Sequence, residues 1–485
     1  MSASASGVFE AKFVIVGGGI AGVSCIETLS FYCQTESILL LTESPIIKAA
    51  TNLVALGKSL TRFDIEQKHA STLPANVQVV TDRLLEVDSH QKIIRTAQQN
   101  HLIKYEFLCI CTGARPKIVD QINATNQKYI LGIRDTESVC DFEKRIQNSR
   151  KIVIVGNGGI ASELVYELKN VAIEWVVKDK YVSQTFVDPG AATFFQTRIK
   201  NKSAESSGSS SQANRPRLIK RMRYTEDAEE TVKKSGAALG PDWHTLFNLT
   251  GKNEDLPKAV HIHYQTGIKN IDINPICDDQ FPVRVTLQND EVLECDFVVS
   301  ATGVVPNLNF KMRAEQFRFG PDGGIFVNEL METSISNVYA AGDVCFAGWE
   351  WAPHWFQMRL WTQARQMGAM AGKSMAAKYN DQHIYPDFCF ELFGHVTQLF
   401  GYQVVLLGKY NGQGLDNKYE ALLRVTQDKE YIKYVLVDGK LQGAILIGET
   451  GLEETTENLI LNQLDLTPYG DDILDPDIDI EDYFD

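Results

Sequence analysis

Three glycines near the start of the chain have the spacing that dinucleotide-binding turns require. Gly17, Gly19 and Gly22 directly follow the apolar run 13–16 and precede a stretch with helical periodicity. In such a strand, turn and helix, the first glycine allows the tight turn and the second lets a pyrophosphate approach the backbone. The third lets the helix pack closely on the strand. Because the unpaired N–H groups of the helix start attract phosphate, we expect a dinucleotide here.

The start of the helix and a later carboxylate complete this first candidate site. Ile20 and Ala21 occupy the first turn of the expected helix, and Glu43 follows the apolar run 38–41. A carboxylate about 20 residues after the last glycine can accept hydrogen bonds from ribose hydroxyls. A glutamate at the end of a strand is also often only a solvated charge, so both interpretations of Glu43 stay open.

A second glycine turn follows the apolar run 152–155. It has alanine in place of the third glycine, at Ala161, which the motif permits. Two such turns predict two bound nucleotides. The residues expected to face the second nucleotide are Gly156, Gly158, Gly159, Ile160 and Glu163.

Lys178 stands at the end of the next expected strand, where many NAD sites have an acid, with Asp179 beside it. A lysine here could attract the 2′-phosphate of NADPH. An exposed basic turn without a role in binding explains it equally well. The sequence therefore leaves the preference between NADH and NADPH open.

The bulk composition sets the limits for any function. A chain of 485 residues with 44% hydrophobic and 22% charged residues predicts two to four folded domains. No apolar run approaches the roughly 18 residues that a membrane span needs. The net charge of −15 argues against direct nucleic-acid binding, and the nine scattered cysteines have no metal-ligand spacing, so we expect no metal site. The small, polar N-terminus lacks the features of a secretory signal, which favours cytosol or nucleus.

Five motifs occur in an order that identifies a family. They are Gly17 to Gly22, Thr112-Gly-Ala114, Gly156 to Ala161, Ala301-Thr-Gly303 and Val338-Tyr-Ala-Ala-Gly342-Asp343. This order resembles the FAD-dependent pyridine nucleotide-disulfide oxidoreductases over nearly the whole chain. The resemblance implies an α/β fold with two Rossmann-like domains, one for FAD and one for NAD(P), the second inserted in the first, and a C-terminal α+β domain.

The expected boundaries follow from these motifs and from composition. The FAD domain takes 1–120 and 295–375, the NAD(P) domain 121–294, and the C-terminal domain 376–485. The stretch near 200–225 is rich in polar residues and is expected to be a disordered insertion. Short apolar runs at 404–408, 431–437 and 444–447 predict strands in the last domain, and the acidic end of the chain predicts a solvated tail.

The resemblance also assigns roles to single residues. It places Thr112, Gly113, Gly342 and Asp343 on FAD, and Glu163 and Gly303 near the nicotinamide. It puts Lys48 close to N5 of the flavin, although a surface lysine is the alternative. Trp361 either lines the flavin or belongs to the core.

One departure from the disulfide reductases argues against their usual chemistry. Those enzymes carry a Cys-x4-Cys pair shortly after the ribose-binding acid, and the corresponding stretch Lys48 to Asn52 has no cysteine. His395 is expected to be a packed or surface histidine and not a catalytic acid. Cys109 and Cys111 share one face of an expected strand, where they are expected to act as buried small hydrophobes, because a disulfide between such close neighbours is strained.

Four further stretches resemble a narrower branch of this family. They are Ser44 to Ala49, Leu131 to Asp135, Gly240 to Trp243 and Asp477 to Asp485. That resemblance implies a flavoprotein of nucleus and cytoplasm in the oxidative stress response, which protects the metal-dependent tRNA ligase complex from oxidation.

Two functions of different classes fit these observations. The first is an FAD-dependent NAD(P)H oxidoreductase with an unidentified electron acceptor. The second is a regulatory flavoprotein that acts by NAD(P)H-dependent protein binding with little turnover. The acidic tail and the basic run 215–223 favour the second, although both can be solvated decoration.

Overall fold

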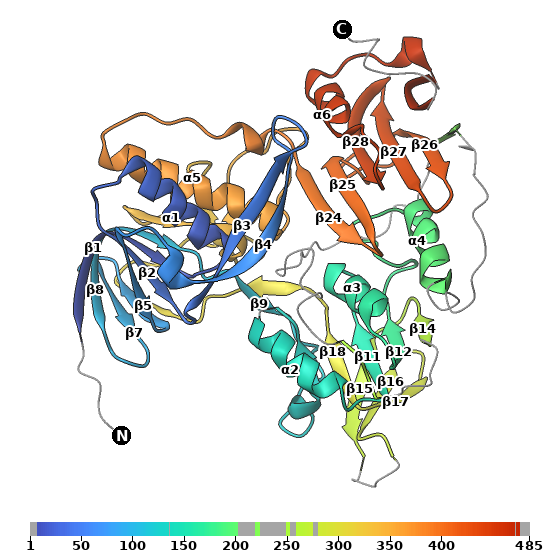
Figure 1. Ribbon diagram of the computed structural model, residues 1–485, viewed down its shortest axis with the longest axis horizontal. Coiled ribbons are helices and arrows are strands. Elements are labelled where there is room, and N and C mark those ends of the chain that lie inside the picture. Colours follow the sequence, from blue (N-terminus) through green and yellow to red (C-terminus); the bar gives the residue numbers. More distant parts are fainter. Residues whose placement is uncertain are drawn as a thin grey trace.

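The computed structural model describes residues 7–134, 136–201, 219–223, 249–252, 259–274, 280–470 and 472–475. It has three folded domains, and the first is built from two segments that flank the second in the sequence (Figure 1). The stretches Gly240 to Trp243 and Asp477 to Asp485, which carried part of the narrower resemblance, lie outside the described residues.

The first domain has a mainly parallel sheet around an apolar central strand. β1 (Val8–Val16) pairs in parallel with β2 (Ile38–Thr42) on one side and with β8 (Leu102–Ile110) on the other. The inner halves of these strands are fully buried and carry no charge, as expected for strands covered on both faces. The sheet also contains β5 (Val77–Thr81), β6 (Leu84–Asp88), β7 (Ile93–Thr96), β20 (Lys311–Arg313) and β22 (Val338–Ala340).

Two helices of this domain pack against each other very closely. α1 (Ile20–Tyr32) follows the first glycine turn, and α5 (Trp361–Tyr379) returns beside it near the end of the domain (Figure 1). A Cβ atom at Gly368 would lie 2.1 Å from the carbonyl oxygen of Ala21. Glycine is therefore required for the contact. α5 runs past the boundary expected at 375.

The second domain has a five-stranded parallel sheet. Its strands, in spatial order, are β10 (Ile130–Gly132), β18 (Phe297–Ser300), β11 (Lys151–Val155), β12 (Ala172–Val176) and β14 (Val260–His263). α2 (Thr136–Ile146) and α3 (Gly159–Glu167) belong to the same unit, and β15 (Ile268–Ile273), β16 (Val283–Leu287) and β17 (Val292–Cys295) form a small sheet beside it.

The position of β18 corrects the expected boundary at 295. This strand lies between β10 and β11, so the second domain extends to residue 300. The chain then returns through β19 (Val304–Pro306), which pairs with β9 (Ala114–Pro116) on the outgoing connection. A buried apolar strand can join either sheet, and the sequence does not show which.

The C-terminal domain is an antiparallel sheet with one helix, α6 (Glu453–Asn462). Its strands are β24 (Gly394–Leu399), β25 (Tyr402–Gly408), β26 (Glu420–Thr426), β27 (Glu430–Val437) and β28 (Lys440–Ile447). The three strands predicted from the apolar runs are confirmed, and each begins one to four residues earlier than its run.

The described part of the insertion within the second domain contains a strand that composition does not predict. α4 (Pro189–Asn201) leads into it, and β13 (Ile219–Arg223) adds an antiparallel edge strand to β26. The expected disorder near 200–225 is therefore wrong at 219–223, and the rest of the insertion after residue 201 lies outside the described residues. An edge strand is held by backbone pairing, so its polar side chains do not reveal in the sequence that it is a strand.

A long hairpin leaves the first domain and reaches the C-terminal domain (Figure 1). It consists of β3 (Ile46–Ala55) and β4 (Thr61–His69), paired antiparallel with a bulge after Thr51. The hairpin occupies the stretch in which the disulfide reductases carry their cysteine pair. The remaining short strands are β21 (Ile325–Val327) and β23 (Cys345–Ala347).

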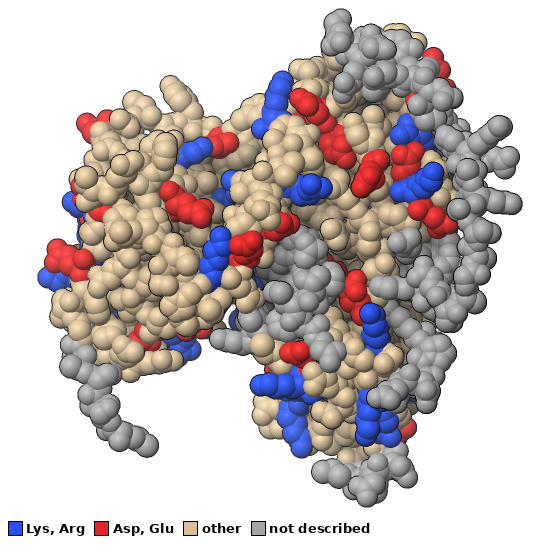
Figure 2. All heavy atoms as spheres, in the orientation of Figure 1, with Lys and Arg blue, Asp and Glu red and all other residues tan. Residues whose placement is uncertain are grey.

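Among the described residues, no helix combines the length and the apolar character that crossing a membrane requires. On the described part of the face in Figure 2, acidic and basic side chains alternate, and neither charge forms an extended field.

Candidate active site

The first glycine turn has one glycine that faces open space and two that face backbone. Gly17 has a φ of +115°, and a Cβ there would lie 2.2 Å from the carbonyl oxygen of Cys111. A Cβ at Gly22 would lie 1.9 Å from the carbonyl oxygen of Gly17. By contrast, a Cβ at Gly19 would meet no atom within 4 Å. Gly17 and Gly22 are thus required by packing, and Gly19 leaves room for a ligand at the start of α1.

A cavity of about 480 Å³ opens over this turn. It extends from the end of β2 to the start of α5, and its volume is in the usual range for a ligand site. Most of the residues assigned to FAD line it together: Gly17, Gly19, Ile20, Ala21, Glu43, Lys48, Thr112, Gly113 and Asp343, with Trp361. Gly22 and Gly342 shape the surrounding turns. Gly342 has a φ of +78°, and a Cβ there would lie 2.8 Å from that of Ala21.

Several polar or aromatic side chains in the cavity wall received no role from the sequence. They include Asp82, Arg83, Arg134, Asn307, Asn309 and Phe310. Arg134 lies in the stretch 131–135, one of those that carried the narrower resemblance, so a signal was present there without an assigned role. The others follow strands of the first domain or its returning connection, and no local motif marks them.

Arg134 and Asp343 form a buried ion pair in the cavity wall. Arg134 also donates from Nε to the carbonyl oxygen of Ala114 at 3.2 Å, while its buried Nη1 has no hydrogen-bond partner among the described residues. Arg359 donates to the carbonyl oxygen of Asp343 at 2.8 Å and so fixes the turn that carries it. A buried guanidinium with a spare donor beside an open helix start fits the anionic middle of a dinucleotide.

The Asp82 carboxylate fixes the turn at the far end of the cavity. Burial raises its pKa, but hydrogen bonds from the Thr96 side chain and from the backbone N–H groups of Gln99, Arg83 and Gln98 outweigh it, so the pKa lies below its usual value. These backbone bonds measure 2.6 to 3.0 Å. The ionised carboxylate therefore organises the loop beside the end of β2.

The hairpin brings Lys48 to the same cavity. The backbone N–H of Lys48 donates to the carbonyl oxygen of Gly18 at 2.9 Å, which fixes the base of β3 to the glycine turn. The side chain is half-buried in the cavity wall. Lys48 is therefore part of the site and not a remote surface lysine.

The described cysteines offer no reactive pair at this cavity. Cys109 and Cys111 are buried free cysteines whose sulfur atoms lie 3.5 Å apart, within hydrogen-bond distance. Hydrogen bonding to Cys111 and Cys25, together with burial, raises the pKa of Cys109 well above its usual value. The expectation that these cysteines are buried on this strand is therefore confirmed.

The second glycine turn repeats the geometry of the first. Gly156 has a φ of +134°, and a Cβ there would lie 2.1 Å from the carbonyl oxygen of Ala301. A Cβ at Gly158 would meet nothing within 4 Å. Gly159 and Ile160 begin α3, Glu163 is buried in it, and Gly303, with a φ of +106°, lies in the turn after β18. The start of α3 therefore leaves the same space for a nucleotide.

Asn157 holds the neighbouring loop onto this turn. Its Nδ2 donates to Asp179 and to the carbonyl oxygen of Tyr181, both at 2.8 Å, and its Oδ1 accepts from the backbone N–H of Ser183 at 2.6 Å. Asp179 is thereby engaged by the glycine turn, while Lys178 before it is exposed.

The strand register places Lys178 where the first domain has Glu43. Val16 pairs with Leu41 in the first sheet, and Val155 pairs with Val176 in the second. Glu43 and Lys178 each stand two residues beyond these partners. Because a cation replaces the ribose-binding acid at this position, the structure favours the interpretation that Lys178 lies near the ribose.

The Lys178→Glu substitution should weaken binding of NADPH more than binding of NADH. A carboxylate near the ribose repels a 2′-phosphate but accepts hydrogen bonds from a 2′-hydroxyl. We expect a rise of roughly tenfold in the Kd of NADPH, about 1.4 kcal/mol, and a smaller change for NADH. Titration with each oxidised nucleotide measures this, and equal changes for both would remove Lys178 from the site.

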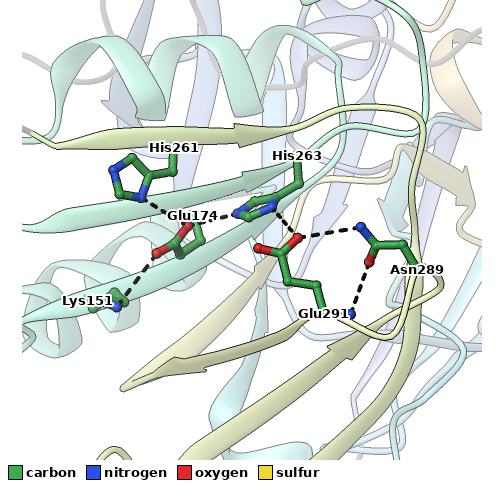
Figure 3. Close-up of polar contacts among 6 residues, drawn as sticks. All are labelled: Lys151, Glu174, His261, His263, Asn289 and Glu291. Carbon is green, nitrogen blue, oxygen red and sulfur yellow. Dashed lines mark hydrogen bonds and ion pairs between the residues drawn. The ribbon is translucent and has the colours of Figure 1, made fainter.

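A polar network centred on Glu174 joins the strand that precedes Lys178 to its neighbours (Figure 3). The buried Glu174 carboxylate accepts from His263 at 2.8 Å and lies 3.6 Å from the Lys151 ammonium, and the other ring nitrogen of His263 lies 3.1 Å from Glu291. The carbonyl oxygen of His263 accepts from the backbone N–H of Val177 at 2.9 Å. The network therefore joins β12, β14 and the small sheet beneath the second nucleotide turn.

One apolar cluster joins the starts of the two nucleotide-binding helices. Ile20 of α1, Phe63 of the hairpin and Trp361 of α5 form it, and Ile160 of α3 packs against it. Since Trp361 also lines the cavity, the two turns open toward a common region.

His395 lies behind Trp361 as a buried neutral side chain. Its ring centre lies 4.9 Å from that of Trp361, and Nδ1 lies 2.9 Å from the Thr362 hydroxyl. Burial lowers the pKa of His395 to about 3. The expectation of a packed histidine is confirmed.

The low pKa of His395 predicts a loss of stability in mild acid. The unfolded chain binds this proton near its ordinary pKa of about 6.5, but the folded protein does not, so the stabilisation is complete above that pH and falls as the pH is lowered. His395 therefore lowers the free energy of unfolding by about 1.4 kcal/mol for each pH unit between roughly pH 6 and 4. His395→Asn should show a shallower decline of Tm between pH 7 and 5. Parallel declines in both proteins would contradict the assignment.

Two glycine turns on mainly parallel sheets, one beside a cavity in the size range of ligand sites and both directed at a common region, define a two-dinucleotide oxidoreductase. The chain belongs to the pyridine nucleotide-disulphide oxidoreductase family, whose model matches residues 11–205 and 254–368. The family expected from the order of the five motifs is confirmed.

Similar proteins cover the whole length of the chain. A Drosophila melanogaster protein named pyridine nucleotide-disulfide oxidoreductase domain-containing protein 1 is 51% identical, over 98% of this chain and 99% of its own. The Homo sapiens protein of the same name is 44% identical, over 98% of both chains. These relatives confirm the narrower resemblance.

Solved structures confirm the fold. A ferredoxin reductase for the CYP199A2 system from Rhodopseudomonas palustris matches with a TM-score of 0.66 at 17% identity, over 98% of this chain and 99% of that one. Putidaredoxin reductase in its covalent complex with putidaredoxin matches with the same TM-score at 14% identity, over 98% of both chains. The chain is an oxidoreductase of a family that uses FAD and NAD(P)H, and its two turns fit these cofactors.

Proposed function

We propose that this protein is an FAD-dependent NAD(P)H oxidoreductase that works without a cysteine pair of its own. One observation carries the proposal: the cavity over Gly19 is lined by the residues that the family resemblance assigns to FAD, while the hairpin that forms its wall presents Lys48 and no thiol. When bound, the two cofactors supply hydride transfer from the nicotinamide to the flavin.

The residues of the chain bind and orient the two cofactors. Gly19 and Gly158 leave the space at the helix starts. In the first cavity the Arg134 guanidinium, held by Asp343, offers positive charge to the phosphates of the dinucleotide. Lys48 places a positive charge in the cavity wall, where it favours negative charge that develops on a bound group. Trp361 and Phe63 exclude water from the region between the turns.

The proposal does not name a single electron acceptor, and several kinds fit the site. The putidaredoxin reductase structure contains putidaredoxin in a covalent complex with its reductase. A small carrier protein, an oxidised partner, a quinone or oxygen would each accept electrons from a flavin at this site. A dithiol relay within the hairpin is excluded, because residues 46–69 contain no cysteine.

The cellular role in the proposal comes from the narrower resemblance. We place the protein in the nucleus and cytoplasm, in the oxidative stress response, where it would protect the tRNA ligase complex from oxidation. We propose no direct contact with nucleic acid or membrane, and NAD(P)H is the small-molecule substrate. The relatives that share 44% to 51% identity over the full length support assignment to this branch.

A regulatory flavoprotein is the alternative. In that role the protein would bind NAD(P)H, adopt a long-lived complex and act by contact with a partner. The acidic end of the chain and the basic run 215–223 favour it, since charged runs of this kind often bind partners.

Anaerobic reduction followed by acceptor addition separates the two proposals. The purified protein is mixed with NADH or NADPH, and the loss of flavin absorbance is followed before and after addition of oxygen, a quinone or a ferredoxin-type carrier. Multiple turnovers with any acceptor support the oxidoreductase. Fast reduction followed by negligible turnover with all of them supports the regulatory role, and no reduction by either nucleotide contradicts both.

A further inference from the structure

The β3–β4 hairpin connects the flavin cavity to the C-terminal domain. Its base is fixed in the first domain, where Lys48 donates to the carbonyl oxygen of Gly18 at 2.9 Å and Ala70 donates to that of Pro45 at 2.7 Å. Its other end reaches toward α6 in the C-terminal domain (Figure 1). The hairpin therefore contacts both the first domain and the C-terminal domain.

The tip of the hairpin is held by one carboxylate. Glu457 of α6 is fully buried and accepts from the backbone N–H groups of Lys58 at 2.6 Å and Ser59 at 2.8 Å, and also from the Ser59 hydroxyl. A Cβ at Gly57 would lie 1.9 Å from the nearer Glu457 oxygen, so a side chain there would displace the carboxylate. Leu60 belongs to the core of the C-terminal domain. We call the contacts of Glu457 with residues 57–59 the tip clamp.

The middle of the hairpin forms part of the wall between the two nucleotide turns. Phe63 of β4 packs on Ile20 and Trp361, which both line the cavity. The ladder of β3 with β4 then continues to Lys48, which pairs with Gln67. A paired ribbon with one bulge, opposite Phe63, therefore runs from the tip clamp to the cavity.

We propose that Glu457 is a positioning residue for the flavin cavity. By fixing the hairpin tip it holds the wall that carries Phe63 and Lys48, so retention of FAD depends on the C-terminal domain. The proposal rests on the flavin cavity of the proposed function and needs no particular electron acceptor. Linkage requires the coupling to be reciprocal, so bound FAD must also stabilise the tip clamp.

The test measures FAD release from the purified holoprotein by the rise in flavin fluorescence on dilution. Glu457→Ala removes the clamp from one side and Gly57→Ala from the other, and each should speed release about tenfold. The double variant should release FAD no faster than Glu457→Ala alone, since the added methyl has room once the carboxylate is gone. Thr456→Val is the control: it removes the contact of Thr456 with Tyr434, 2.8 Å long, inside the C-terminal domain, and should leave the rate unchanged.

Backbone hydrogen exchange supplies a readout that does not depend on catalysis. In the wild type, exchange at Lys58 and Ser59 should be several-fold slower with FAD bound than in the apoprotein, and this difference should vanish in Glu457→Ala. If Glu457→Ala does not fold, the exchange rates with and without FAD are compared in Gly57→Ala and Glu457→Gln instead.

Unchanged FAD release in the clamp variants, or equal acceleration in Thr456→Val, would overturn the proposal. So would tip exchange that is the same with and without FAD. A wild-type protein that binds no FAD would instead contradict the proposed function, and exchange in the apoprotein would still show whether Glu457 holds the hairpin.

Discussion

Gly19→Ala should give a folded protein that has largely lost its FAD. A Cβ at this position meets no protein atom within 4 Å, so the new methyl group enters the space reserved for the dinucleotide and not the core. Overpacking of a close contact costs about 1 to 3 kcal/mol, which is roughly 5- to 150-fold in the Kd of FAD. Fluorescence titration of the apoprotein with FAD measures this, with the Tm of the apoprotein unchanged.

Gly22→Ala is the matched comparison in the same turn. There the methyl would lie 1.9 Å from the carbonyl oxygen of Gly17, so we expect a lower Tm of the apoprotein or failure to fold. If Gly19→Ala instead lowered the Tm as much as Gly22→Ala and left FAD binding intact, the assignment of this helix start to the dinucleotide would be wrong.

Gly158→Ala should leave FAD in place and remove the nicotinamide nucleotide. The second turn has the same open space, and its methyl group would lie at the start of α3, away from the walls of the flavin cavity. We again expect roughly a 5- to 150-fold rise in Kd, now for NADH and NADPH. The protein should stay yellow but need far more nucleotide for reduction.

Comparison of the two variants separates the sites. Loss of FAD from Gly158→Ala, or normal reduction of that variant at low NADH, would contradict a separate nucleotide site at α3. Opposite effects of two chemically identical changes could not come from a general loss of stability.

The glycine turns were predictable because their geometry leaves few alternatives. Gly17 and Gly156 have φ angles of +115° and +134° and lie against carbonyl oxygens, which only glycine tolerates. The spacing of such glycines after an apolar strand is therefore visible in the sequence. Glu43 was found from its position after the strand next to the turn, whereas Lys48 was found only through the family resemblance.

The role of Arg134 in the site was not predictable from the sequence alone. Arg134 pairs with Asp343, which lies 209 residues later, and the pair forms only because the second domain is inserted into the first. The position of β18 was missed for a related reason, because an apolar strand of four residues fits either parallel sheet. Contacts between distant segments leave no spacing pattern.

The β3–β4 hairpin could be predicted from the sequence only in part. The absence of cysteine at 48–52 excluded a dithiol, but it did not show what replaces it. The replacement is an extended ribbon whose tip is held by Glu457, about 400 residues further along the chain. Only the folded protein brings this carboxylate to Lys58 and Ser59.

The visible absorbance spectrum of the purified protein, before and after anaerobic addition of NADH, tests the central claim most directly. Two nucleotide sites that open toward a common region predict a flavin spectrum at the start and its loss when NADH is added. A protein that remains colourless after reconstitution with FAD, or a flavin spectrum that neither NADH nor NADPH changes, would contradict the account.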